Sequence, residues 1–279
     1  MTRLSENTLQ GLGKKLPDYD LELIQKTGSS LATIAFLAAG LEEKNLKKNV
    51  FSMPIAVVPV TAGKGLIPGF SQAVKSIIRY LGFPAFVTQA YDVAGLAESF
   101  KKGSKILFLA DDDLFVAINT ETGNVVNNSE ATARGYVAAL ALLLKGISGR
   151  EVLVIGAGRV GRYACIALKE LGAAVCVFDI DPDKTSSLAS ELGISVERDI
   201  LLALKKHSIL FDASPAGDII SEDLVRPDTA VAACGLPMGL TRGARIQIQG
   251  RLIHDPLQIG TATMLTMALN MYNKCKAGG

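Results

Sequence analysis

Short apolar runs recur along the chain, and most are followed by a segment whose apolar positions repeat at helical spacing. Runs of this length predict buried strands, and the amphipathic segments predict helices. The predicted strands span residues 55–60, 85–88, 105–110, 114–118, 151–155, 173–178, 208–213, 230–234 and 245–248. The predicted helices span residues 5–16, 20–27, 31–41, 72–81, 93–101, 129–145, 183–192, 199–206 and 259–274, with one more that ends at Leu171. This alternation is typical of an α/β fold.

The clearest pattern lies between Ser148 and Pro182, where a strand, a tight turn, a helix and a second strand follow one another. The turn carries three glycines in the spacing G-x-G-x-x-G, namely Gly156, Gly158 and Gly161. Asp179 stands at the tip of the second strand, 18 residues after the third glycine. A lone glycine motif is weak, but the motif in this full context is typical of a dinucleotide-binding domain.

Each residue of the turn has a physical role in such a site. Gly156 permits the tight turn, Gly158 lets a pyrophosphate approach the backbone, and Gly161 lets the helix pack closely on the strand. The helix begins near Arg159 and Val160, where free N–H groups and the helix dipole attract phosphate. The alternative is a glycine-rich turn in a domain that no longer binds a cofactor.

Asp179 predicts which dinucleotide is bound. Its carboxylate would accept hydrogen bonds from the ribose hydroxyls and would repel a 2′-phosphate, which favours NAD over NADP. Two further pairs follow strand ends that should flank the nicotinamide. We expect these residues, Ser214 with Pro215 and Cys234 with Gly235, to contact the cofactor.

The chain has 279 residues, which is enough for two domains. The exit of the predicted helix 129–145, at Gly146–Gly149, marks the expected boundary, and the apolar C-terminal helix is of a kind that crosses back to the first domain. We therefore expect an α/β substrate domain over residues 1–147, completed by residues 257–279. A Rossmann domain should occupy residues 148–256.

Charge and composition exclude several classes of protein. The formal net charge is +2, and no basic stripe is interleaved with aromatic residues, so nucleic-acid binding is not indicated. No apolar run reaches membrane-spanning length, and the N-terminus lacks a signal pattern. These features and four scattered cysteines fit a protein of the reducing cytoplasm. A homodimer is an open expectation for its assembly.

No metal site is expected from the spacing of ligand residues. The cysteines are not spaced for metal binding, and those in apolar segments are expected to be small buried hydrophobes. The chain has only two histidines, His207 and His254, which excludes a His-rich site. His207 is expected at a surface helix end. His254 with Asp255 could form a general base, but a turn leading to the last helix is the favoured interpretation.

Two loops of the first domain could carry chemistry. Residues 60–71 follow a strand and contain three glycines, which suits either a plain connection or a substrate loop. Asp111, Asp112 and Asp113 follow the strand 105–110 directly. They could form a solvated turn. Alternatively, mutual repulsion could raise one pKa toward neutrality and create a base, and Asp111, nearest the strand, is the stronger candidate.

Five stretches together resemble the pyrrolysine synthase family. They are IAVVPVTAGKGLIPGFSQAV (55–74), RYLGFPAFVTQAYDVAG (79–95), ILFLADDD (106–113), VLVIGAGRVG (152–161) and IGTATML (259–265). The resemblance spans nearly the whole chain in the same order, and its first, third and last stretches are specific. It implies an N-terminal substrate domain, a C-terminal Rossmann domain and NAD.

The resemblance also implies a reaction and a substrate pocket. The substrate would be the isopeptide L-lysine-Nε-3-methyl-D-ornithine, whose terminal amine is oxidised before ammonia is lost and a pyrroline ring closes. By motif matching, the substrate-pocket positions are Leu4, Val60, Thr61, Ala62, Phe70 and Asp111. Ala62 stands where a serine would be expected. A carboxylate such as Asp111 could hold the amine, take or relay its proton, and stabilise the developing iminium.

Two other functions remain open at this point. Another two-domain NAD dehydrogenase could act on an amino acid or a 2-hydroxy acid, but a hydroxy-acid site needs a cationic histidine and an arginine. Only His254 could serve as the former, and Arg79 is the sole arginine near the Gly63–Asp113 loops. A protein that only senses NAD would bind it without turnover.

Overall fold

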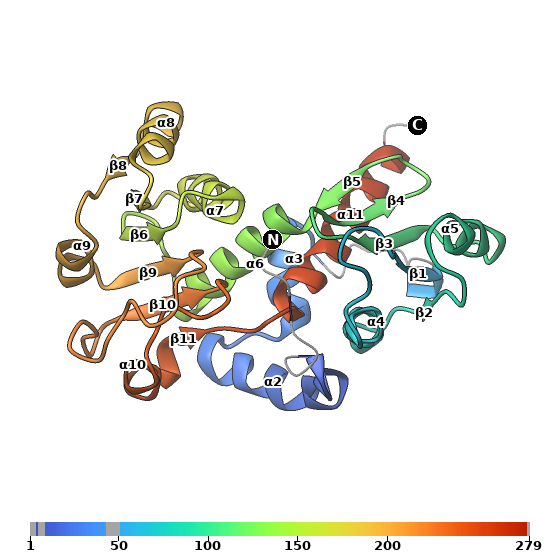
Figure 1. Ribbon diagram of the computed structural model, residues 1–279, viewed down its shortest axis with the longest axis horizontal. Coiled ribbons are helices and arrows are strands. Elements are labelled where there is room, and N and C mark those ends of the chain that lie inside the picture. Colours follow the sequence, from blue (N-terminus) through green and yellow to red (C-terminus); the bar gives the residue numbers. More distant parts are fainter. Residues whose placement is uncertain (1–3, 5–8, 43–50, 278–279) are drawn as a thin grey trace. The chain divides into compact units, whose positions relative to one another are not determined.

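The computed structural model describes residue 4, residues 9–42 and residues 51–277, with side chains as far as residue 270. Contacts divide the chain into two compact units, whose elements are labelled in Figure 1. Unit 1 comprises Met1–Glu22, Ser30–Ala131 and Pro256–Gly279, and unit 2 comprises Leu23–Ser29 and Thr132–Asp255. The boundary between Ala131 and Thr132 falls within α6 (Asn128–Leu143), ahead of the boundary expected at residue 147.

Unit 1 is built on a five-stranded sheet in the order β2-β1-β3-β4-β5. Its strands are β1 (Ile55–Pro59), β2 (Ala85–Val87), β3 (Ile106–Ala110), β4 (Phe115–Asn119) and β5 (Val125–Asn127). β1 pairs in parallel with β2 and β3, whereas β4 is antiparallel to both of its neighbours. The carboxyl ends of β1 and β3 therefore meet at one edge, where ligands bind in open α/β sheets.

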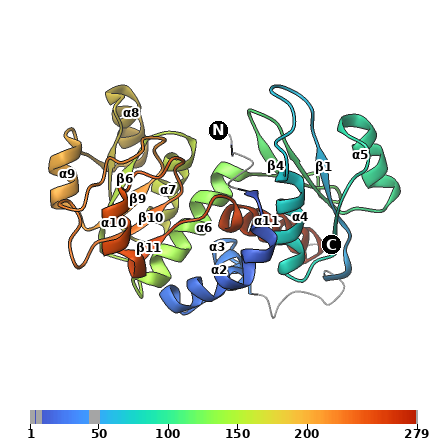
Figure 2. The ribbon, with the colours of Figure 1, turned by 60° about the horizontal axis from the view of Figure 1, so that its bottom comes forward.

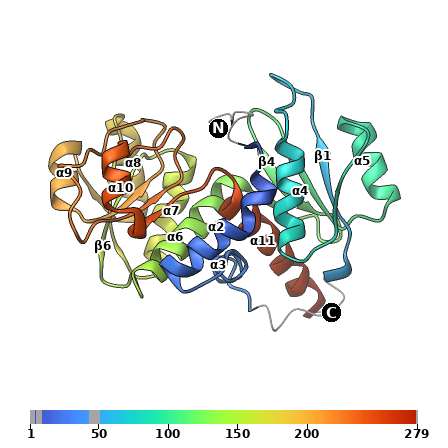
Figure 3. The ribbon, with the colours of Figure 1, turned by 90° about the horizontal axis from the view of Figure 1, so that it is seen from below.

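Helices cover both faces of this sheet (Figure 2). They are α4 (Phe70–Tyr80), α5 (Asp92–Lys101) and α11 (Gln258–Ala277), and α3 (Leu31–Ala38) packs on α11. Leu96 of α5 packs on Ala56 and Val58 of β1, so alternate β1 side chains face α5. The C-terminal α11 lies beside α3 (Figure 3), and the Thr266 hydroxyl donates to the Ala35 carbonyl at 2.7 Å. The last helix thus packs within the first unit.

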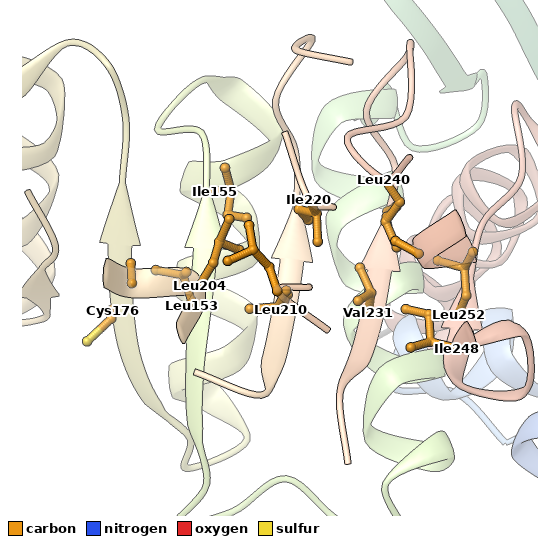
Figure 4. Packing of buried hydrophobic residues seen from close by; sticks show 14 residues of the cluster. Leu153, Ile155, Cys176, Leu204, Leu210, Ile220, Val231, Leu240, Ile248 and Leu252 are labelled. Atoms are coloured by element: carbon orange, nitrogen blue, oxygen red, sulfur yellow. The ribbon is translucent and has the colours of Figure 1, made fainter. Parts of the chain in front are cut away.

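Unit 2 contains a six-stranded sheet, all parallel, in the order β11-β10-β9-β6-β7-β8. Its strands are β6 (Glu151–Ile155), β7 (Ala174–Phe178), β8 (Ser195–Val196), β9 (Ile209–Asp212), β10 (Ala230–Ala233) and β11 (Leu252–Ile253). Its helices include α7 (Arg159–Glu170), α8 (Pro182–Leu192), α9 (Ile200–Lys206) and α10 (Arg242–Gln247). Figure 4 shows the apolar cluster on the sheet face that α9 and α10 cover. This is the Rossmann-type arrangement expected from the glycine motif.

The N-terminal segment differs from the two helices expected there. One helix, α2 (Leu12–Thr27), covers residues 12–16 of the first range and all of the second, and it contains Pro17, while residues 5–8 lie outside the described residues. Leu12, Leu16 and Leu23 are all buried and share one helical face. Burial of that face outweighs the hydrogen bond that Pro17 cannot donate.

The strand expected at residues 245–248 is wrong, because this segment belongs to α10. The Thr241 side chain caps the helix by accepting a hydrogen bond from the Ala244 N–H at 3.2 Å. Ala244 and Ile248, four residues apart, are buried, whereas Ile246 is 66% exposed. The burial period is therefore helical, and the late strand is β11, which pairs with β10.

Candidate functional site

The glycine-rich turn joins β6 to α7 at the carboxyl edge of the unit 2 sheet. Gly156 has a φ of 98°, which residues with side chains rarely adopt. A Cβ on Gly161 would overlap the carbonyl oxygen of Gly156, whereas a Cβ on the exposed Gly158 would meet no protein atom within 4 Å. Packing within the protein therefore requires glycine at 156 and 161 but not at 158, where the open backbone suits an approaching ligand.

The N-terminus of α7 lies directly after this turn. Gly158 is its N-cap residue and makes no side-chain capping bond, so no internal acceptor competes with an anion there. Arg159 is exposed and Val160 is half-buried in the first turn. The residues present thus fit the pyrophosphate of a dinucleotide.

Asp179 lies next to the turn, as its position after β7 predicts. Its Oδ2 accepts a hydrogen bond from the Ala157 N–H at 2.6 Å, and its Oδ1 accepts one from the Asp181 N–H at 2.9 Å. Each carboxylate oxygen has a second lone pair that a ribose hydroxyl can use. Asp179 therefore fixes the turn and can also bind a sugar diol.

Asp212 organises the remaining predicted cofactor residues, and sequence reasoning missed it. This buried side chain ends β9, and its Oδ1 accepts hydrogen bonds from the Ser214 N–H (3.1 Å) and hydroxyl (2.8 Å). Its Oδ2 accepts one from the Gly239 N–H at 3.0 Å. Its main-chain carbonyl accepts from the N–H groups of Cys234 (3.0 Å) and Gly235 (3.2 Å).

These bonds tie together the loops that follow β9 and β10. Burial raises the pKa of Asp212, while the hydrogen bonds from Ser214 and Gly239 oppose the rise. Pro215, next to Ser214, is exposed. The sequence does contain a signal for the role of Asp212 in ordering these loops. Asp212 is an acid at the end of an otherwise apolar strand, directly before the Ala-Ser-Pro sequence.

Gly158→Ala and Gly161→Ala should have opposite effects. We expect Gly158→Ala to weaken NAD binding on the order of tenfold, about 1.4 kcal/mol, with unchanged stability, because its methyl group would meet only the ligand. Gly161→Ala should lower the free energy of unfolding by about 1–3 kcal/mol, because the added carbon must displace the Gly156 carbonyl. Calorimetric NAD titration and denaturant unfolding measure both. Unchanged NAD affinity in Gly158→Ala would contradict this assignment.

A pocket in unit 1 opens where β1 and β3 end. Four of the predicted substrate residues line it, namely Leu4, Val60, Phe70 and Asp111. Its apolar wall includes the rings of Phe70, Phe108 and Phe115, with Phe70 and Phe115 edge to face at a centroid distance of 5.2 Å. Asp111 and Asp112 also line it. The pocket therefore combines an aliphatic and aromatic wall with carboxylates, which suits a chain that carries an amine.

Asp111 shapes the turn between β3 and β4. Its Oδ1 accepts hydrogen bonds from the N–H groups of Asp113 (2.9 Å) and Leu114 (2.8 Å). These bonds, from Leu114 and then Asp113, lower the pKa of Asp111, so the rise expected from neighbouring carboxylates is wrong. The side chain is exposed and stays ionised at neutral pH, which suits an electrostatic partner of a cation better than a base that must hold a proton.

Asp112 holds the loop that follows β1. Its Oδ2 accepts a hydrogen bond from the Lys64 N–H at 2.6 Å, and a Cβ on Gly63 would collide with its carboxyl group. Gly63 also has a φ of 71°. The loop over residues 60–69 is thus tied to the acidic turn, which accounts for glycine at this position.

Thr61 and Ala62 are exposed and do not line the pocket. Thr61 donates from its main-chain N–H (2.8 Å) and its hydroxyl (2.6 Å) to the Asp92 carboxylate. These bonds lower the pKa of Asp92. The Thr61 side chain therefore links the loop to α5 in this structure.

His254 and Asp255 lie in the connection that leads from β11 to α11. The imidazole Nδ1 of His254 lies 2.7 Å from the Ala233 carbonyl, which makes it the donor in that bond. The Asp255 main chain accepts from the Tyr136 hydroxyl at 2.7 Å and donates back to it at 2.8 Å. His207, expected at the surface, is buried.

Comparison with known proteins follows the division of the chain. Residues 8–126 match the family described as "Pyrrolysine biosynthesis protein PylD, N-terminal domain". Residues 126–237 match "Alanine dehydrogenase/PNT, C-terminal domain". The described residues contain no helix that is both long and apolar enough to cross a membrane.

Two curated relatives are similar along most of their length. Pyrrolysine synthase of Methanosarcina acetivorans is 31% identical over 255 residues, which cover 90% of this chain and 97% of the relative. Pyrrolysine synthase of Methanosarcina barkeri is 33% identical over 251 residues, with coverage of 88% and 93%. Shikimate dehydrogenase of Aquifex aeolicus has a similar fold, with a TM-score of 0.53, 17% identity and coverage of 82% and 93%.

Proposed function

Because the chain belongs to the pyrrolysine synthase family, and so is a nicotinamide-dependent oxidoreductase of pyrrolysine biosynthesis, we propose that it oxidises L-lysine-Nε-3-methyl-D-ornithine. The bond broken first is a C–H bond of the carbon that carries the terminal amine of the ornithine part. The observation that supports this most directly is the unit 1 pocket, in which ionised Asp111 lies at the end of an apolar wall.

The overall reaction balances without a further reactant except water. When bound, NAD⁺ accepts a hydride from the amine-bearing carbon. The neutral amine thereby becomes an iminium ion, which water converts to an aldehyde and ammonium. The neighbouring α-amine then condenses with the aldehyde, releases water and closes the pyrroline ring.

Asp111 contributes charge at the point where the substrate becomes positive. A neutral amine gains a full positive charge as the hydride leaves. A fixed carboxylate therefore stabilises the positively charged transition state more than it stabilises the bound neutral amine. The Asp113 and Leu114 N–H groups both bind Oδ1. Oδ2 is the atom we assign to the amine.

The rest of the pocket fits the methylene chains of the isopeptide. Val60, Phe70, Phe108 and Phe115 supply apolar surface against which the methylene groups can pack, and Leu4 adds to it. Thr61 and Ala62 line no part of the pocket as described, so their contribution to substrate binding would need the loop over residues 60–69 to move.

The cofactor is held by the turn and the acid described above. Gly156, Gly158 and Gly161 with the start of α7 would bind the pyrophosphate, and Asp179 would bind the ribose diol. We place the contacts to the nicotinamide half at Ser214, Pro215, Cys234 and Gly235, which Asp212 orders.

A substrate panel tests this function. The isopeptide should support NADH formation, and the same panel should contain 2-hydroxy acids and amino acids without the isopeptide bond. Turnover of a hydroxy acid alone would contradict the proposal and would indicate a hydroxy-acid dehydrogenase. NAD binding without any turnover, unaffected by Asp111→Ala, would indicate a protein that only senses NAD.

A further inference from the structure

A second cluster of reactive side chains lies in unit 2, at the opposite edge of the sheet from the glycine turn. Glu151 is the first residue of β6, Cys176 is in the middle of β7, and His207 follows α9 just before β9. The mechanism above uses none of them. We propose that Glu151, Cys176 and His207 bind a divalent transition-metal ion, zinc by the chemistry of the donors.

The spacing of the donor atoms fits one ion. The Cys176 Sγ lies 3.8 Å from Oε1 of Glu151, and the His207 Nδ1 lies 3.5 Å from Oε2 of the same side chain. All three residues place one donor atom within 4.8 Å of the others. Ligands of a tetrahedral zinc ion with ordinary bond lengths are separated by about 3.3–3.8 Å. Only small side-chain shifts are needed to complete the site.

The imidazole of His207 supplies a second, independent observation. Its side chain is fully buried, and Nδ1 has no hydrogen-bond partner. A buried polar nitrogen without a partner is rare in folded proteins and points to an absent water or ion. Nδ1 is also the ring atom that lies toward Glu151, so an ion at the cluster would satisfy it.

Glu197 holds the ring in the arrangement typical of metal sites. The His207 Nε2 lies 2.9 Å from Oε1 of Glu197. A metal-binding histidine usually donates its other N–H to a carboxylate, which fixes the tautomer and directs the free nitrogen to the ion. With Nε2 protonated and bonded to Glu197, Nδ1 presents the lone pair that coordination requires.

The charges around the cluster also favour a cation. Glu151 and Glu197 contribute two carboxylates, and one lysine, Lys206, lies beside them, with Nζ 2.7 Å from Glu197 and 3.8 Å from Glu151. The carboxylates therefore outnumber the neighbouring cation.

The rival interpretation is an imidazolium that bridges the two carboxylates without any metal. In that case the Cys176 thiol would be a packing residue only, as its place at the end of the apolar cluster in Figure 4 allows.

This cluster could not be predicted from the sequence, because its three residues are far apart in the chain. Cys176 follows Glu151 by 25 residues and His207 follows Cys176 by 31, so no short metal-binding motif exists, and the sequence predicted no metal site. The parallel pairing of β6 with β7 and β9 brings the three residues together.

Titration of the full chain with Co²⁺ tests the proposal, because cobalt bound by a thiolate gives a near-ultraviolet charge-transfer band. We expect a band that saturates at one ion per chain and is displaced by Zn²⁺. Cys176→Ser should abolish it, whereas Cys165→Ser, which changes another buried thiol of unit 2, should leave it unchanged. Glu197→Gln should weaken metal affinity by about 10- to 100-fold, because the carboxylate charge that strengthens the Nε2–H bond of His207 and the basicity of its Nδ1 is lost.

Two results would overturn the proposal: no charge-transfer band with the wild-type chain, or a band that persists in Cys176→Ser. NAD affinity serves as the control for folding, and it should stay within about threefold of wild type in each variant. If Cys176→Ser does not fold, Glu151→Gln and Glu197→Gln decide the question, since undiminished cobalt affinity in both would contradict the site. No substrate is used, so the outcome is independent of the proposed reaction.

Discussion

Asp111→Asn is expected to slow hydride transfer by about 10²–10⁴-fold, with NAD affinity nearly unchanged. The asparagine carbonyl can still accept the hydrogen bonds of Asp113 and Leu114, so the turn between β3 and β4 should persist. Only the charge beside the amine is removed. A single-turnover measurement of NADH formation gives the rate.

Asp113→Asn is the matched control for this variant. Asp113 is exposed in the same turn and does not line the pocket, so its effect should be mild. A rate for Asp111→Asn within about threefold of wild type would contradict the assignment. The role would then pass to Asp112, which also lines the pocket, or to His254, and pH–rate profiles of those variants would decide between them.

The pH dependence distinguishes a charged partner from a base. The pKa of Asp111 is below the ordinary value of 3.8, so its carboxylate stays ionised as the pH falls until the lowered pKa is reached. Loss of activity caused by protonation of Asp111 should therefore occur below about pH 4. An acid limb near neutral pH that disappears in Asp111→Asn would instead indicate a base with a raised pKa.

Asp179→Ala is expected to weaken NAD binding by about 1.5–3 kcal/mol, or about 10- to 150-fold. The variant loses the acceptors of the ribose diol and also the bond to the Ala157 N–H that fixes the glycine turn. Asp179→Asn keeps one acceptor oxygen and should have a smaller effect. Calorimetric titration with NAD and NADP measures both variants, and equal affinity of the wild type for the two dinucleotides would contradict the role of Asp179.

Helices and strands could be predicted where residues only a few positions apart determine which side chains are buried. The glycine turn, α7 and β7 could be predicted because the motif fixes positions only a few residues apart. The segment 245–248 was misread because two isoleucines at alternate positions look like a strand. Its helix depends on the Thr241 cap and on burial of Ala244 under the sheet, which no short window of sequence reveals.

The positions of the candidate residues along the strands could be predicted from the sequence, but their hydrogen bonds and pKa shifts could not. Asp111 follows β3, as its place in the sequence predicts, yet its pKa shift depends on two main-chain N–H groups whose direction only the turn sets. Asp212 orders Ser214 and Gly235 through bonds between loops that are distant in the sequence. Contacts made by strand pairing, like those of Cys176 and His207, could not be read from spacing.

The most direct test of the proposed reaction is a turnover of L-lysine-Nε-3-methyl-D-ornithine with NAD⁺, in which NADH, ammonia and the product mass are measured together. The account predicts NADH and ammonia in equal amounts. It also predicts a product lighter than the substrate by one ammonia and two hydrogen atoms, which is the mass of the closed ring. NADH formation without ammonia release, or no NADH at all from this isopeptide, would contradict it.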